Sequence, residues 1–272
     1  MITPTLLLAG TSLAPAEPGG FHAPGPDIFN FPPLWEGAPT WLTKPTLLAM
    51  LSVLILIVVM WGAFANPKIV PRGLQNIGEI GYMFVRDQVA RPFLGKDAER
   101  FMPLLVSIFF LVLLWNVMGV IPVVQFPVAS HIAFPIVLAA TIYIMRIYLG
   151  IKYQGPIGYF KNMMFPPGVP KAVYILLAPI ELLSNLILAP FTHAVRLFAN
   201  MFAGHMILAF FSLVGFYFLF ENFGPLGAPL GLLGTVVTIA MTGLEIFIQY
   251  LQAFLFAMLA AMYIGQSLHA DH

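Results

Sequence analysis

A long apolar stretch dominates the second half of the chain. It runs from Val173 to Glu221 as VYILLAPIELLSNLILAPFTHAVRLFANMFAGHMILAFFSLVGFYFLFE. A helix needs only about 20 apolar residues to cross the hydrocarbon core of a bilayer. A second apolar stretch, at about 229–268, also far exceeds that length. Since a helix of about 40 residues would reach about 60 Å, we expect both segments to be steeply tilted, broken, or folded into two shorter pieces.

The composition extends this expectation to the whole chain. Of its 272 residues, 60% are hydrophobic and 8% are charged, whereas an ordinary globular domain carries about 25% charged residues. Because hydrocarbon offers no partner to a free N–H or C=O group, spanning segments must be helices or a closed barrel. The apolar runs are continuous rather than alternating, so we predict an all-α polytopic membrane protein. The net charge of +1 does not suggest nucleic acid, and the absence of cysteine excludes disulfides and thiolate metal sites.

Shorter apolar runs predict the rest of a membrane domain, which we place at 41–272. An irregular outer segment, 1–40, precedes it, and its apolar stretch lacks the basic residues that begin a signal peptide. Lysines and prolines predict a loop between about 150 and 172. We expect about five crossings, the last two long and tilted, and one interfacial amphipathic helix with charges along one face. The expected helices are about 46–65, 70–95 (interfacial), 101–121, 131–149, 173–221 and 229–268.

Basic residues are distributed unevenly along the chain. Most lie after the first span or near and beyond the end of the third, whereas the turns near 122–130 and 221–229 have none. Because cytoplasmic loops are enriched in Lys and Arg, we expect the N-terminus outside and the C-terminus in the cytoplasm. The residues on which this orientation rests are Lys68, Arg72, Arg86, Arg91, Lys96, Arg100, Arg146, Lys152, Lys161 and Lys171.

Arg196 differs from the other basic residues because it lies inside a long apolar stretch. A charge at bilayer depth costs about 2.5–3.5 kcal/mol on insertion scales, and a guanidinium cannot escape by losing its proton. A carboxylate or a water-filled cavity must therefore compensate it. An arginine that snorkels from a helix end is the alternative, but both ends of the stretch are far away. Pro190, just before Arg196, predicts a local kink or widening of the helix.

Polar residues form a stripe around Arg196. At about 100° per residue, Asn185 and Thr192 fall within about 60° of it, and Asn200 lies a further turn along. His205 points to the opposite side, so we expect it to face another helix. This pattern predicts a helix whose arginine and histidine serve different neighbours.

The last apolar stretch has a polar stripe of its own, in which Glu245 has no basic residue nearby along the chain. An ionisable group inside the membrane is a functional candidate by default. Since imidazole and carboxyl groups exchange protons near neutral pH, we expect Glu245 to act with His205. Gln249 and Gln252 are equally well explained as polar glue between helices. The stripe consists of Thr238, Thr242, Glu245, Gln249, Gln252 and Tyr263, which share an arc of about 80°.

Other polar residues leave alternatives open. His193 could line an aqueous path or be a tolerated neutral histidine. Glu181 could mark a proton exit or cap a polar contact, with Ser184 and Asn185 beside it. The sequence shows no Gly-rich phosphate-binding loop and no dense cluster of oxygen ligands for sodium, so we expect no cofactor and no metal.

Two motifs resemble the F-type ATP synthase subunit a family. The stretch from Pro190 to Gly204, with Arg-Leu-Phe-Ala-Asn-Met-Phe-Ala-Gly at its centre, resembles the penultimate helix of that family. The second motif, Glu245-Ile-Phe-Ile-Gln-Tyr-Leu-Gln-Ala-Phe-Leu-Phe-Ala, is similar to its last helix. The expected layout agrees as well, and the resemblance covers nearly the whole chain after residue 40.

The resemblance implies a proton-translocating stator subunit of a bacterial inner membrane. Its expected partners are a ring of c subunits, the peripheral-stalk b subunits, other ATP synthase subunits and lipid, and ATP would be made elsewhere in the complex. Arg196 matches the arginine that faces the ring carboxylates and separates two aqueous half-channels. Asn200, His205, Glu245 and Gln252 match outer half-channel positions, and some members carry Glu and His exchanged at 205 and 245. By the derived orientation, Gln249 joins the outer half, and Glu181, Ser184, Asn185 and His193 serve the inner half.

Two other function classes remain alternatives at this point. A secondary transporter of a small anion would use Arg196 as the substrate counter-ion, and inverted repeats would support it, but the sequence shows none. A non-conducting scaffold of a respiratory complex would tolerate removal of Arg196 without a change in proton flux.

Overall fold

The computed structural model describes residues 21, 23–37, 39–65, 67–121, 126–165, 170 and 173–268. These residues form helices and their connections, with Pro33 and Thr43 as an isolated antiparallel bridge, which confirms the all-α prediction. Five of their helical segments are long and apolar enough to cross a membrane, as expected. These segments are Lys44–Phe64 (α1), Leu74–Val117, Ala133–Gln154 (α5), Tyr174–Glu221 and Gly227–Leu268 (α9).

The chain divides into two compact units, each built from distant stretches of sequence. The first unit holds the described residues up to Leu51 together with Trp115–His131 and Ala199–Tyr250. The second holds Ser52–Leu114, Ile132–Phe198 and the described residues from Leu251. Both of the longest helices therefore contribute residues to each unit.

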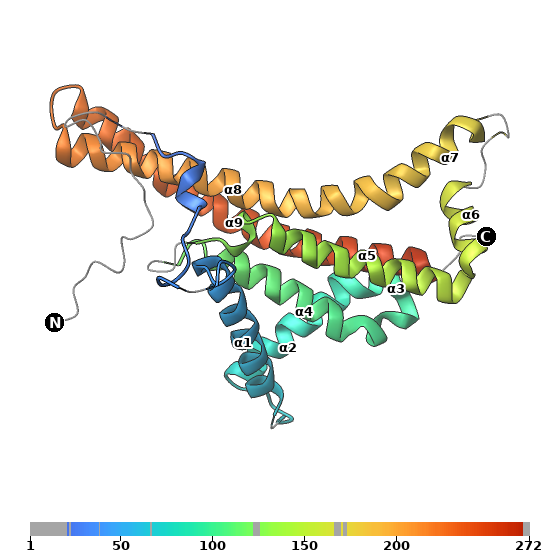
Figure 1. Ribbon diagram of the computed structural model, residues 1–272. Coiled ribbons are helices and arrows are strands. Elements are labelled where there is room, and N and C mark those ends of the chain that lie inside the picture. Colours follow the sequence, from blue (N-terminus) through green and yellow to red (C-terminus); the bar gives the residue numbers. More distant parts are fainter. Residues whose placement is uncertain are drawn as a thin grey trace. The chain divides into compact units, whose positions relative to one another are not determined.

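Neither long apolar stretch folds into two shorter pieces (Figure 1). The first is a continuous helix of 48 residues and the second, α9, has 42 residues. At about 1.5 Å per residue they reach about 70 Å and about 60 Å, roughly twice the hydrocarbon thickness, so each must tilt steeply or extend beyond the hydrocarbon. The first helix consists of α7 (Tyr174–Leu183), the π turn η6 (Ser184–Leu188), α8 (Ala189–Phe216) and the π turn η7 (Tyr217–Glu221).

The π turn η6 has a cause in the sequence. Pro190 has no N–H to donate, and in a regular α-helix its ring would clash with the carbonyl of residue 186. The wider turn just before it relieves this clash, so the widening predicted near Arg196 is present. A π turn also rotates the preceding residues relative to the following ones. Asn185 lies within this turn and accepts a hydrogen bond from Arg146 of α5, whereas Thr192 and Arg196 are exposed.

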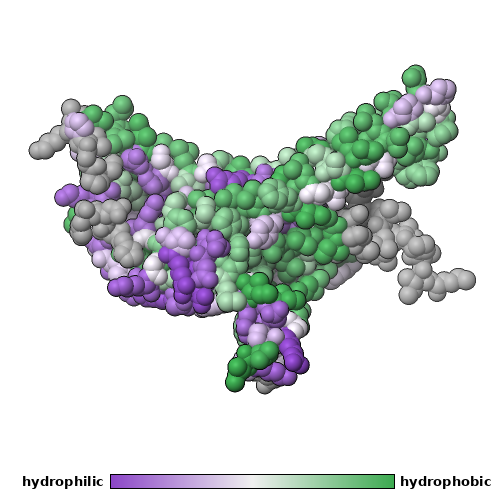
Figure 2. Space-filling view, turned by 180° about the vertical axis from the view of Figure 1, so that it is seen from behind, coloured by the Kyte–Doolittle hydropathy of each residue, from purple (hydrophilic) through white to green (hydrophobic). Residues whose placement is uncertain are grey.

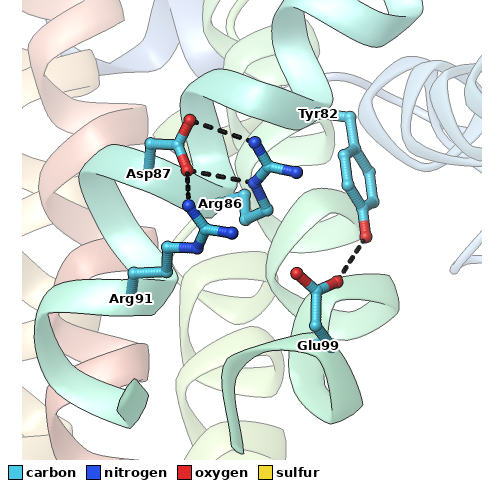
Figure 3. A network of polar contacts seen from close by, with 5 residues as sticks. All are labelled: Tyr82, Arg86, Asp87, Arg91 and Glu99. Carbon is cyan, nitrogen blue, oxygen red and sulfur yellow. Dashed lines mark hydrogen bonds and ion pairs between the residues drawn. The ribbon is translucent and has the colours of Figure 1, made fainter. Parts of the chain in front are cut away.

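The region predicted as an interfacial helix is amphipathic but interrupted. Asp87 lies 3.0 Å from Arg86 and 2.9 Å from Arg91, and Tyr82 donates a hydrogen bond to Glu99 at 3.1 Å (Figure 3). These exposed pairs contribute little stability each, whereas Val85, on the same stretch, is fully buried. The elements here are α2 (Leu74–Val85), the π turn η3 (Arg86–Ala90), α3 (Arg91–Leu94), η4 (Gly95–Asp97) and α4 (Ala98–Val117).

A short helix, α6 (Pro156–Met164), lies where the sequence predicts only a loop. Gly155 adopts a φ of 74°, which suits glycine, and Pro156 occupies the first turn, where no N–H is needed. Gly150 of α5 lets α6 fold back, because a Cβ there would lie 2.3 Å from the ring of Tyr159. The Gly-Pro pair is the signal that could have predicted this helix.

Apolar side chains are exposed over much of the surface, as the green areas of Figure 2 show. Trp61 is 74% exposed, Ile175 84% and Phe220 73%. Soluble monomers rarely expose contiguous apolar patches larger than a few hundred Å². This surface therefore needs to be covered by lipid or by partner proteins.

Glycines bring α8 and α9 close together within the first unit. A Cβ on Gly234 would lie 2.7 Å from the backbone nitrogen of Gly215, and one on Gly215 would lie 2.8 Å from the hydroxyl of Thr235. Such close approach through small residues is typical of helix pairs in membranes. It keeps the facing side chains of the two helices within contact distance.

Candidate functional site

His205 of α8 and Glu245 of α9 form a buried pair. His205 Nε2 lies 3.0 Å from Glu245 Oε1, and the two side chains are 11% and 5% exposed. The prediction that His205 faces another helix is confirmed, and so is its expected proximity to Glu245. Gly204 makes room for the carboxyl group, because a Cβ there would lie 3.0 Å from Glu245 Oε1. The 3.0 Å separation brings an imidazole and a carboxyl group together, although among the described residues neither His205 Nε2 nor Glu245 Oε1 makes a hydrogen bond.

Two residues that sequence reasoning missed lie near this pair. Asn116, near the end of α4, donates a hydrogen bond from Nδ2 to the backbone oxygen of Gln249 at 3.1 Å. Gly119 lies against His205, since a Cβ there would be 2.4 Å from Nε2. A lone asparagine in the apolar run of α4 was the available signal, but a single polar residue does not reveal which helix it faces.

A cavity of about 430 Å³ within the first unit reaches His205. Thr238 and Thr242 of α9 line it, and Ile28, Phe29 and Phe31 close another side. His131 Nε2 lies 2.9 Å from the backbone oxygen of Phe29 and anchors this segment. The volume is sufficient for several water molecules. A space large enough for water therefore reaches the imidazole of His205.

Arg196 is exposed on α8, 22 residues after Tyr174 and 25 before Glu221. Within the described part of the chain, no carboxylate lies within ion-pair distance of its guanidinium. Thr192, one turn earlier, is also exposed, and Asn200, one turn later, is half-buried. A charge that stays exposed on a long apolar helix needs water or a carboxylate from another molecule.

Glu181 and Asn185 form a second polar cluster, in the second unit. Asn185 Nδ2 donates to Glu181 Oε2 at 2.9 Å and to the backbone oxygen of Glu181 at 3.1 Å. Arg146 Nη2 donates to Asn185 Oδ1 at 3.2 Å. The orientation expected from the sequence uses Arg146 as a charge near the end of the third span, but its side chain is only 5% exposed and faces other helices. A count of charges along the sequence cannot tell an inward-facing arginine from a flanking one.

The remaining predicted site residues lie on the two long helices, and Gln249 alone of them belongs to the first unit. His193 is 3% exposed and packs among aromatic rings, with its ring centroid 3.9 Å from that of Phe256 and 6.1 Å from that of Tyr263. Ser184 is half-buried at the start of η6. Gln252 and Gln249 are 2% and 1% exposed, and Gln252 belongs to the second unit.

These features define a polytopic helical membrane protein that handles protons or other small ions. The described residues hold a buried imidazole–carboxyl pair next to a cavity, a partly buried polar cluster around Asn185, and an exposed arginine on a long apolar helix. Among the described residues, no three His, Cys, Asp or Glu side chains gather closely enough to hold a metal ion.

Comparison with known proteins specifies this class. The ATP synthase A chain family matches residues 46–265. An ATP synthase subunit a from Streptomyces lividans is 43% identical over 93% of this chain and 89% of its own length. One from Rhodococcus erythropolis is 41% identical over 97% and 95%, and one from a Nocardioides species is 37% identical over 98% and 100%.

The chain belongs to the ATP synthase A chain family, the proton-conducting stator subunits of F-type ATP synthases. It is a multi-pass membrane protein of a bacterial ATP synthase, and catalysis of ATP formation resides elsewhere in that complex. The resemblance seen in the sequence is thereby confirmed, and the transporter and scaffold alternatives are set aside.

Proposed function

We propose that protons cross this subunit through two offset aqueous half-channels that Arg196 separates, and that they travel between them on the carboxylates of a rotating ring of c subunits. The observation that carries this proposal is the exposed Arg196, for which the described residues supply no carboxylate within ion-pair distance. Since a guanidinium keeps its charge at lipid depth, it needs water or a carboxylate beyond the described residues, and the proposal assigns this role to the carboxylates of the c-ring.

The outer half-channel would use the pair formed by His205 and Glu245 and the cavity next to it. Water in the 430 Å³ cavity delivers a proton to His205, which passes it to Glu245 across the 3.0 Å contact. Gln249 continues the polar face of α9 one turn further, and Asn200 that of α8 towards Arg196. Gln252 lies a further three residues along α9 and either hands the proton on or holds the two helices together.

The inner half-channel would use the polar cluster of Glu181 and Asn185. Glu181, held by Asn185, accepts the proton that leaves the ring and releases it towards the cytoplasm. Ser184, at the wide turn η6, and the buried His193 lie along the same helix. The orientation that this requires, with the N-terminus outside and the C-terminus in the cytoplasm, rests on the distribution of Lys and Arg along the chain.

The charge of Arg196 makes the two half-channels work in sequence. A ring carboxyl group that has taken a proton from the outer side is neutral and can turn into lipid. When a protonated group returns to Arg196, the positive charge favours loss of its proton into the inner half-channel. The same charge repels a proton that would pass directly between the halves. Each proton crossing about 100 mV releases about 2.3 kcal/mol, so several protons are needed for each ATP.

The proposal also assigns surfaces to partners. The apolar face that exposes Arg196 and Thr192 would lie against the c-ring. The amphipathic stretch from α2 to α3 would lie in the membrane interface, with the Asp87 network in the headgroup region. The peripheral-stalk b subunits would cover part of the remaining apolar surface.

ATP-driven proton pumping in inverted membrane vesicles tests the proposal. We expect Arg196→Ala to abolish pumping in a complex that still assembles, as judged by co-purification. Arg91→Ala is the matched control, because it also removes an exposed arginine but only breaks a surface ion pair with Asp87. Normal pumping by the Arg196→Ala complex would contradict the separation of the half-channels by this residue.

A further inference from the structure

Arg146 is a buried cation to which the proposed function gives no task. It is 5% exposed in the middle of α5, and no carboxylate among the described residues lies within ion-pair distance of it. Its guanidinium instead lies 4.8 Å from the ring centroid of Tyr263 and 5.6 Å from that of Tyr143. Burying an arginine in a membrane helix is expensive, so such a residue is a functional candidate. The hydrogen bond that Arg146 donates to another helix indicates what that function is.

That hydrogen bond settles which way the amide of Asn185 must point. A guanidinium has only donors, so Asn185 must present its carbonyl oxygen to Arg146, and Arg146 Nη2 donates to it at 3.2 Å. The amide nitrogen of Asn185 then faces Glu181 and donates to the carboxyl oxygen Oε2 at 2.9 Å. A flipped amide would set N–H groups against the guanidinium and an oxygen against the carboxylate, so both contacts would become repulsive.

We propose that Arg146 is a positioning residue of the inner half-channel, which fixes Asn185 so that its amide N–H group holds the carboxylate of Glu181. This proposal rests on the proposed role of Glu181 as the inner proton acceptor. In this role Arg146 contacts neither the transported proton nor the c-ring, and it acts only through Asn185. The guanidinium lies over the rings of Tyr143 and Tyr263 and donates from Nη2 to Asn185.

The side chains at positions 146 and 185 provide a graded test of this role. Arg146→Gln removes the charge and can pair with Asn185 in either amide orientation, so Glu181 loses its fixed donor. We expect ATP-driven pumping and passive proton conductance after removal of the catalytic sector to fall about tenfold, as for the loss of one charge-assisted hydrogen bond. Arg146→Lys keeps a donor-only cation, so we expect it to recover a substantial part of the lost rate.

A double-mutant cycle separates positioning from general stability. If Arg146 acts through Asn185 and Glu181, Arg146→Gln should add no further loss in a Glu181→Gln background. Asn185→Ala removes the side chain that links Arg146 to Glu181 and leaves the arginine in place. It should match the loss of Arg146→Gln, and it keeps the test available if that variant fails to assemble. Lys152→Gln is the control, since it removes the same charge from an exposed position on the same helix.

The outcomes are distinguishable from failure of the proposed function. If Arg196→Ala abolishes pumping but Arg146→Gln pumps normally, or its loss adds in full to that of Glu181→Gln, the positioning role is overturned and the half-channel proposal stands. Equal pumping by Arg146→Gln and Arg146→Lys would also overturn it, because a donor-only cation would then have no advantage. If Arg196→Ala itself pumps normally, the half-channel proposal fails first.

Discussion

At the residue scale, the pair formed by His205 and Glu245 requires one imidazole and one carboxyl group, and either order would supply them. We expect His205→Ala and Glu245→Gln each to lower ATP-driven pumping by about tenfold or more, because each removes one partner of a proton transfer. The exchanged double variant, His205→Glu with Glu245→His, should recover a large part of the rate, since it restores both groups across the same 3.0 Å contact.

Comparison of the double variant with the single exchanges is the decisive measurement here. His205→Glu alone places two carboxyl groups together, and Glu245→His alone places two imidazoles together, so both should pump poorly. Recovery in the double variant above both single variants would support a shared task. A double variant that pumps no better than either would show that the two residues act separately.

The room around His205 leads to a second prediction at this scale. A Cβ on Gly119 would lie 2.4 Å from His205 Nε2, so Gly119→Ala forces the imidazole or the backbone at 119 to shift, and we expect the contact with Glu245 to be disturbed. We expect slower pumping with normal assembly, measured by vesicle acidification and by co-purification. Gly62→Ala in α1 is the matched control, because a Cβ there meets nothing within 4 Å. Equal rates for the two variants would show that the ring position is not critical.

At the element scale, the sequence predicted helices and their facing residues better than it predicted rotation about a helix axis. His205 and Glu245 were found because they lie on regular stretches of α8 and α9, where a spacing of about 100° per residue holds. The angle expected between Asn185 and Arg196 did not allow for the π turn η6, which contains Asn185 and changes that spacing. Arg146 was misjudged for a different reason: its burial depends on Tyr143, Tyr263 and Asn185, which no count along the sequence brings together.

The close contact between α8 and α9 gives the prediction that belongs to elements. A Cβ on Gly234 would lie 2.7 Å from the backbone nitrogen of Gly215, so Gly234→Ala must push the two helices apart. Overpacking of this kind costs about 1–3 kcal/mol. We expect a lower thermal unfolding midpoint of the purified complex and a lower yield. Gly243→Ala, on the same helix but in open space, should leave both unchanged, and equal midpoints for the two variants would contradict this role of the contact.

At the scale of the whole molecule, the exposed apolar surface and the polar clusters impose opposite requirements. Ile175 and Phe220 need lipid or a partner protein, whereas His205 and Glu181 need a path to water. Positions that face lipid are not in contact with water, whereas positions on a proton path are. A reagent that reacts only in water can therefore distinguish the two kinds of surface. They can also be assigned to one side of the membrane or the other, which the proposed orientation requires.

The absence of cysteine from the chain makes this assignment direct. A thiol reacts as the thiolate, which forms readily only where water is present, so a charged, membrane-impermeant reagent reports wet positions. We expect Thr238→Cys, which lines the cavity, to be labelled in right-side-out vesicles, and Ser184→Cys to be labelled in inverted ones. Ile239→Cys, beside Thr238 but 69% exposed on the apolar surface, should resist labelling from both sides. Labelling of Thr238→Cys only in inverted vesicles would reverse the proposed orientation, because the cavity would then open to the cytoplasm.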